Sequence, residues 1–119
     1  MPKLERTVSG RYNFDEVLDF FHQNLMDGTI SASYESGSDY QAGAVRCALR
    51  VYERYSLMGD GRLSLTLMLV GDGEKIFLSA ISAAGGRGVG KVVGWGEDRF
   101  LNDLKALADQ LETDEEVKH

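Results

Sequence analysis

Cysteine is almost absent from this chain, and its scarcity bears on the compartment. Cys47 is the only cysteine among the 119 residues, so no disulfide can form within the chain. Disulfides are common in secreted proteins and rare where thiols are kept reduced. We therefore expect a cytoplasmic protein, in which Cys47 is a small core residue.

Long apolar runs and a positive net charge are absent as well. No uninterrupted apolar stretch approaches the roughly 20 residues that a membrane-spanning helix needs, and residues 1–12 lack the apolar centre of a secretory signal. The formal net charge is −6, whereas non-specific binding to nucleic acid depends on neutralising phosphates. Neither a membrane nor a nucleic acid is therefore an expected partner.

Histidine is equally scarce. His22 and His119 are the only histidines, and neither forms a cluster with Cys47 at the spacing of metal ligands. No nucleophile stands beside a base in a pattern typical of covalent catalysis. We expect no metal, no cofactor and no catalytic residue, so the balance is against an enzyme, although the question stays open.

The clearest pattern that is present is the alternation in Val45–Ser56. Apolar residues and arginines take turns along this stretch, the apolar ones being Val45, Cys47, Leu49 and Val51 and the arginines Arg46, Arg50 and Arg54. Successive side chains of a strand point to opposite faces. The alternation predicts a half-buried strand with its apolar side in the core and its cationic side in solvent.

Two other stretches have the period of a helix. Phe14–Asp27 follows Asn13, which with Glu16 resembles a capping box, and Gly28 supplies a stop. Phe100–Leu111 has a second apolar stripe. Both are expected to be amphipathic helices.

The remaining chain has mostly a period of two. Strands are expected at about Leu4–Tyr12, Ile30–Glu35, Ala42–Leu57, Leu63–Leu69 and Ile76–Ala83. The last of these is apolar on both faces, which indicates a strand covered on both sides. Composition predicts a turn at Ser36–Asp39 and hairpin loops at Gly59–Gly61 and Gly71–Gly73.

The order of these elements is strand, helix, four strands, helix. An antiparallel meander with one apolar face must bury that face, and two amphipathic helices are available to cover it. We predict a single domain over residues 1–119, with a frayed tail at 113–119. Its fold class is α+β, a two-layer sandwich in which a mainly antiparallel sheet of about five strands has both helices on one face. The order resembles the helix-grip arrangement of TATA-binding-protein-like folds.

Four short motifs carry a closer resemblance. They are Ser31–Glu35, Arg50–Ser56, Phe77–Ser82 and Gly96–Leu101. Together they resemble a family of small, uncharacterised bacterial proteins known only as a domain of unknown function, over about Val8 to Leu111. The resemblance implies a bacterial, cytosolic origin and brings no activity, substrate or catalytic residue with it.

The segment Gly85–Gly96 is unusually rich in glycine. Its start fits the GxxxxGK part of a phosphate-binding loop, but Val92 stands where a magnesium-binding Ser or Thr belongs, and no helix is expected to follow directly. A loop with chance glycine spacing is the favoured interpretation. The alternative is anion binding by loop amides together with Arg87 and Lys91.

The best candidate binding surface is the cationic side of Val45–Ser56. It combines the three arginines, Arg46, Arg50 and Arg54, with Tyr52. Guanidinium groups bind carboxylates and phosphates through paired hydrogen bonds. A solvated sheet face, with Glu35 pairing one arginine, explains the same residues and is the commoner case.

Two functions fit these observations. The preferred one is a non-catalytic binding or protein-interaction module, which associates with itself or with a protein partner through the arginine-bearing face or a strand edge. The alternative is a domain for a small anionic or apolar ligand, or a modest enzyme, with a cleft between sheet and C-terminal helix and the Gly85–Gly96 loop as a lid. A sheet–helix interface packed solid would favour the first; its leucines are Leu63, Leu65, Leu67, Leu104 and Leu107.

Overall fold

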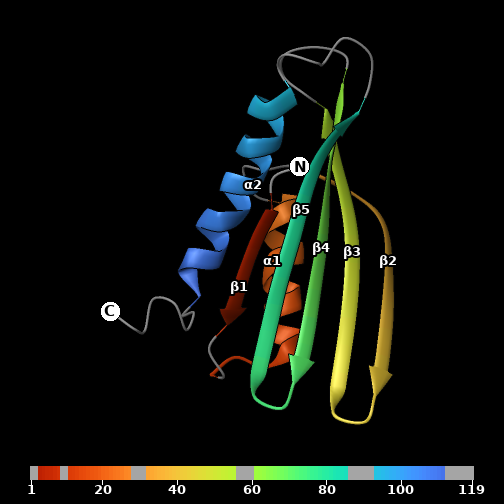
Figure 1. Cartoon of the computed structure of the whole chain (residues 1–119), viewed down its shortest axis with the longest axis vertical. Helices are drawn as coiled ribbons and strands as arrows, with labels where there is room; N and C mark the ends of the chain where they lie inside the picture. The colour runs from red at the N-terminus through yellow and green to blue at the C-terminus, as the bar shows by residue number, and fades with distance from the viewer. Residues whose placement is uncertain (1–2, 9–10, 28–31, 56–60, 86–92, 112–119) are drawn as a thin grey trace.

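One antiparallel sheet and two helices make up the computed structural model, which describes residues 3–8, 11–27, 32–55, 61–85 and 93–111 (Figure 1). The strands are β1 (Lys3–Val8), β2 (Ser33–Ala42), β3 (Val45–Tyr55), β4 (Arg62–Asp72) and β5 (Lys75–Gly85). They lie in the order β1-β5-β4-β3-β2, and all neighbours are antiparallel. The helices are α1 (Phe14–Asp27) and α2 (Val93–Gln110). The predicted α+β fold is confirmed, and the expected frayed tail lies outside the described residues.

Helix α1 has the bounds that its sequence predicts. The Asn13 side-chain oxygen accepts a hydrogen bond of 2.8 Å from the Glu16 amide, and the Glu16 carboxylate accepts one of 2.9 Å from the Asn13 amide. This reciprocal capping box satisfies two amides that the first turn leaves without partners. The apolar stripe of α1, from Phe14 to Leu25, is buried.

Two tight hairpins set the registers of the sheet. Each has a glycine with positive φ at the first loop position, Gly43 (58°) between β2 and β3 and Gly73 (64°) between β4 and β5. Glycine adopts this conformation without the penalty that a Cβ imposes. The Gly71–Gly73 hairpin is confirmed, whereas the Gly59–Gly61 loop falls largely on residues 56–60, outside the described part.

The predicted turn at Ser36–Asp39 is wrong, because these residues lie inside β2. Serine and glycine are weak strand formers, but here they pair with β3 along the whole edge strand, and a bulge between Tyr34 and Ser36 absorbs one residue. Gly37 is also needed for space, since a Cβ there would lie 2.5 Å from the Tyr34 hydroxyl.

Helix α2 begins at Val93, within the glycine-rich segment and earlier than expected. Each glycine weakens a helix by about 1 kcal/mol, so tertiary packing has to hold α2 in place. Its stripe of Phe100, Leu104 and Leu107 is buried against the sheet. A neighbouring ion pair of 2.9 Å joins Arg6 of β1 to Asp109.

The core lies between the helices and one face of the sheet. The apolar side chains that fill it come mainly from α1, β4, β5 and α2, and the largest fully buried ones include Phe21, Leu25, Leu65, Leu67, Leu69, Leu78, Phe100 and Leu104. The five leucines expected at the sheet–helix interface are all buried. Within the described residues, neither helix combines the length and the apolar character that crossing a membrane requires.

The predicted orientation of β3 is wrong. Residues opposite each other on paired strands share a face, and Ala48 and Tyr52 pair with Leu69 and Leu65 of the core. The even positions of β3, which include the three arginines, therefore face the helices. Because the side-chain period is two, exchanging the faces of a strand moves its whole apolar set. Here that set faces away from the helices.

We call the side of the sheet opposite α1 and α2 the open face. Figure 1 looks onto it, with α1 behind the strands. No described helix or strand lies on this side.

Candidate functional site

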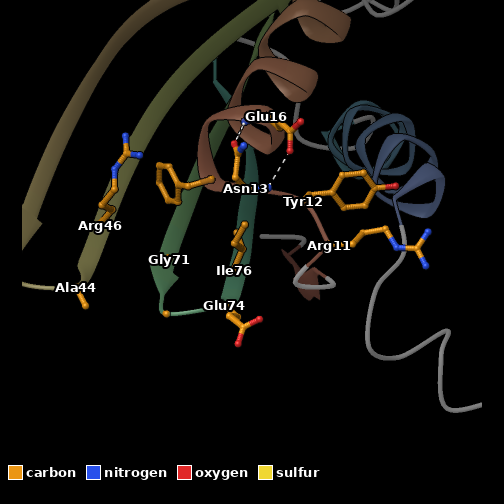
Figure 2. A pocket seen from close by; sticks show the side chains of 11 residues that line it. Arg11, Tyr12, Asn13, Glu16, Ala44, Arg46, Gly71, Glu74 and Ile76 are labelled. Carbon is orange, nitrogen blue, oxygen red and sulfur yellow. Dashed lines mark hydrogen bonds between the residues drawn. The ribbon is translucent and has the colours of Figure 1, made fainter.

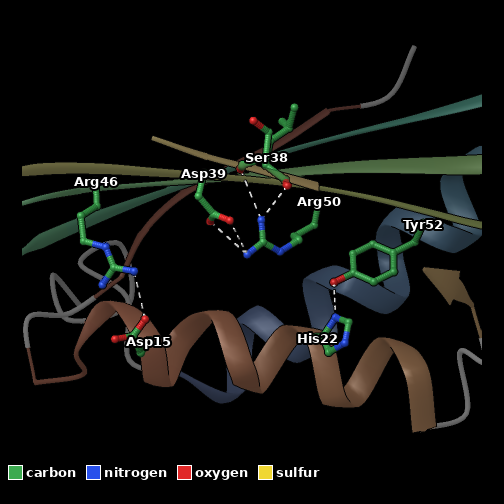
Figure 3. A network of polar contacts seen from close by, with 8 residues as sticks. Asp15, His22, Ser38, Asp39, Arg46, Arg50 and Tyr52 are labelled. Atoms are coloured by element: carbon green, nitrogen blue, oxygen red, sulfur yellow. Dashed lines mark hydrogen bonds and ion pairs between the residues drawn. The ribbon is translucent and has the colours of Figure 1, made fainter. Parts of the chain in front are cut away.

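The three predicted binding arginines lie between the sheet and the helices. Figure 3 shows Arg46 and Arg50 pointing from the sheet toward α1. The guanidinium of Arg46 lies 4.3 Å from the centroid of the Phe14 ring and 3.1 Å from the Asp15 carboxylate. Arg54 lies 4.4 Å from the Phe100 ring centroid and 3.3 Å from a carboxylate of α2, that of Asp103.

These two arginines thus connect β3 to each helix by the same device. In each case the guanidinium lies over an aromatic ring of the helix, and a carboxylate of the same helix binds it. The predicted solvated cationic face does not form, and Arg46 and Arg54 are engaged in joining the two layers.

Arg50 is used within the sheet. It donates to both carboxylate oxygens of Asp39 at 3.0 and 3.3 Å, to the Leu49 carbonyl at 2.9 Å and to the Ser38 carbonyl at 3.3 Å. Its side chain is 17% exposed. The expected carboxylate partner of an arginine was Glu35. For Arg50 that partner is Asp39, which lies two residues from Gly37, the residue of β2 that pairs with Arg50.

Tyr52, the fourth candidate, is fully buried and hydrogen-bonded to His22, which was not among the candidates. Its hydroxyl lies 2.8 Å from Nδ1 of His22 on α1, and the Tyr34 ring packs at centroid distances of 5.5 Å from His22 and 5.8 Å from Tyr52. Burial raises the pKa of Tyr52 to about 12, against the opposing charge of Arg50. The phenol therefore stays protonated at neutral pH, which suits a structural hydrogen bond better than proton transfer.

The position of His22 offered a signal. It stands one residue after Phe21 and three before Leu25, at the flank of the apolar stripe of α1, where a polar side chain can reach a strand below the helix.

The other two candidates, Arg87 and Lys91, lie outside the described residues. The same holds for most of the proposed lid. The anion-binding interpretation of that loop stays a prediction.

A hollow of about 320 Å³ opens where α1 begins, beside the two glycine hairpins (Figure 2). It has two guanidinium groups, from Arg11 and Arg46, alongside two carboxylates, from Glu16 and Glu74. Arg46 is already bound to Asp15, and Glu16 caps the helix. The hollow therefore contains charged groups of both signs, and two of these groups already bind other parts of the protein. Its lining favours no particular class of ligand.

The open face collects the apolar residues that were expected in the core. One row crosses four strands without interruption, through Tyr40, Cys47, Val70 and Phe77. Further apolar residues on this face are Val45, Leu49, Val51, Met68 and Ile81. Tyr40, Leu49 and Ile81 are 68%, 38% and 40% exposed. Cys47 is half-buried here, so its predicted place in the core is wrong.

Charged groups of the open face lie around its margin in pairs of opposite sign. Lys3 and Glu5 form an ion pair of 3.7 Å on the edge strand β1. Two other pairs among the described residues are Glu53 with Arg62, which are in contact, and Asp72 opposite Lys75. Glu35, in the bulge of β2, adds a carboxylate that Ser33 binds.

The profile of one protein family matches residues 1–112, which include every helix and strand described above. The chain belongs to DUF6054, a family of unknown function. The predicted family resemblance is thereby confirmed. No curated protein matches this DUF6054 chain, and no solved structure does either.

The sequence of this DUF6054 protein contains one signal for the open face, which is the apolar character of both sides of β5. Residues 76–83 are apolar on both faces, and the expectation was cover on both sides. In the described part, the even-numbered side chains such as Leu78 are covered by helices, while Phe77 and Ile81 face the uncovered side.

Within the residues that the structure describes, no group of His, Cys, Asp and Glu side chains has the arrangement of a metal site.

Proposed function

We propose that this DUF6054 protein is a non-catalytic protein-interaction module whose binding surface is the open face of its sheet. The observation that carries the proposal is the apolar row from Tyr40 to Phe77, together with exposed Leu49 and Ile81. Soluble monomers rarely expose contiguous apolar patches larger than a few hundred Å², and larger ones mark interaction sites.

The layout of the open face supports this function. Protein interfaces have a centre depleted in charge and a polar rim. The paired positions in the middle of the face, such as Leu49 with Met68 and Cys47 with Val70, are uncharged. The ion pairs of Lys3 with Glu5 and of Glu53 with Arg62 lie toward its margin.

The rest of the molecule supports binding over catalysis. The leucines between sheet and helices are buried, and the arginines of β3 are engaged with rings and carboxylates. We place the module in a bacterial cytoplasm, where a reduced Cys47 serves as a small apolar contact.

The proposal is tested by light scattering on the protein isolated gently from its own host. We expect a particle larger than the 13.1 kDa chain. Leu49→Lys puts a charge in the middle of the open face and should return the particle to the mass of one chain. Gln23→Lys is the matched control, because Gln23 is exposed on α1, on the other side of the sheet.

Two results would contradict the proposal. One is a single-chain mass for the wild-type protein from its host. The other is a larger particle that Leu49→Lys leaves intact although the variant folds.

A further inference from the structure

We infer that the partner on the open face is a second copy of this chain, so that two sheets pack face to face with the helices outside. This inference rests on the proposed function and names the occupant of the same surface. In such a symmetric contact the same residues serve both copies. The surface must therefore be complementary to itself.

Charge is the first argument for a second copy. The chain has a net charge of −6, so two copies repel each other over most approaches. Over the open face this repulsion is weak, because its described charged groups occur with neighbours of opposite sign, as in Lys3 with Glu5 and Asp72 with Lys75. Glu35 is an additional carboxylate at the outer edge. A nearly neutral face with an uncharged middle lets two acidic copies meet.

Size is the second argument. Strands are about 4.8 Å apart and rise about 3.3 Å per residue, so five strands of about ten residues present on the order of 800 Å². A standard stable interface buries about 800 Å² on each partner. The open face is thus large enough for a dimer without help from loops.

The patterning of β5 is the third argument. Phe77 and Ile81 lie on its uncovered side, and Leu78 and Ala80 lie on its helix side. Strands with two apolar faces belong to sheets that are covered on both sides. Two sheets packed at about 10 Å supply the second cover.

The position of Cys47 makes this arrangement testable. The apolar residues of the open face are centred between the Cys47–Val70 pair and the Leu49–Met68 pair. If two such patches coincide, the twofold axis passes near Cys47. The two thiols then face each other across sheets about 10 Å apart. No other cysteine is present to confuse the result.

The experiment uses the purified full-length chain with no other protein. Sedimentation should show a dimer, twice the 13.1 kDa chain. Leu49→Lys should raise the dimer dissociation constant at least about tenfold, because the two new charges lie close together, and Gln23→Lys should not change it. If Leu49→Lys fails to fold, Ile81→Lys replaces it, since Ile81 is 40% exposed on the same face.

A short bis-maleimide should link two wild-type chains through Cys47. The matched control is the double variant Cys47→Ser with Gln23→Cys, which keeps one thiol but places it on α1; it should dimerise without being linked. A dimer that is not linked at Cys47, or one that Leu49→Lys leaves unchanged, would overturn the face-to-face arrangement.

The outcomes separate this inference from the function on which it rests. If the purified chain is monomeric at every concentration while the protein from its host forms a larger, Leu49-dependent particle, the occupant is another protein and the second-copy inference is wrong. If both preparations are monomeric, the proposed function fails as well.

Discussion

Arginine in β3 has a structural role that its charge alone does not predict. Arg46 and Arg54 each place a guanidinium over a ring and beside a carboxylate of the facing helix. Arginine is weakly hydrated for a cation and has a long apolar stem, so it tolerates a half-buried layer better than lysine does. Interpreting these arginines as a solvated face therefore assigned β3 the wrong orientation.

The Tyr52–His22 hydrogen bond leads to a prediction at this scale. Tyr52→Phe removes it and leaves His22 without that partner, so the free energy of unfolding should fall by about 1 kcal/mol at neutral pH. The measurement is urea unfolding of the variant and the wild type. Equal stability would show that the bond is not formed in solution.

The raised pKa of Tyr52 gives a second, pH-dependent expectation for the same pair of proteins. The phenol has an ordinary value of 10.0 and about 12 in the folded protein. Between these values the folded state keeps the proton and the unfolded state loses it, so stability falls as pH rises from 10 toward 12. The fall should be steeper for the wild type than for Tyr52→Phe. Equal slopes would mean that Tyr52 is not buried as described.

At the scale of elements, the orientation of β3 is tested by two neighbouring substitutions. Ala48→Asp places a charge in the layer under the helices, where Ala48 is 1% exposed, and should destabilise the fold by several kcal/mol. Leu49→Asp places the same side chain on the open face and should retain a cooperative unfolding transition. Thermal unfolding followed by circular dichroism distinguishes them, and the reverse ranking would restore the original interpretation.

How far an element could be predicted depended on whether its determinants are local. The bounds of α1 followed from Asn13, Glu16 and an apolar stripe, all within the helix itself. The two faces of β3 could not be ranked in this way, because each contains groups able to lie in a core. Pairing with the leucines of β4 decides between them, and that pairing is a long-range property.

The same distinction explains the other two errors. Ser36–Asp39 has the composition of a turn, but pairing with β3 keeps it extended. The glycines at the start of α2 argued against a helix, whereas packing of Phe100 and Leu104 against the sheet supports it. The candidate site was misplaced for the same reason. Its arginines were identified correctly, but they were assigned to the solvent side of β3 and lie on the helix side.

At the scale of the whole molecule, the two sides of the sheet differ in whether other elements cover them. One side has a closed core, in which Leu65, Leu67 and Leu78 are fully buried. The other presents a face whose total area is on the order of a standard interface, with apolar side chains in its middle. A second sheet would complete the molecule as four layers, with helices outside and two sheets inside.

The most direct test of whether a second copy covers the open face is the reaction rate of the Cys47 thiol with a small maleimide over a range of protein concentrations. Cys47 lies half-buried on the open face and is the only thiol, and its rate depends on access. We expect the wild-type rate to fall as the protein concentration rises, because a second copy covers the face, and the rate of Leu49→Lys to stay constant over the same range. A wild-type rate that does not change with protein concentration would show that no second copy covers the open face.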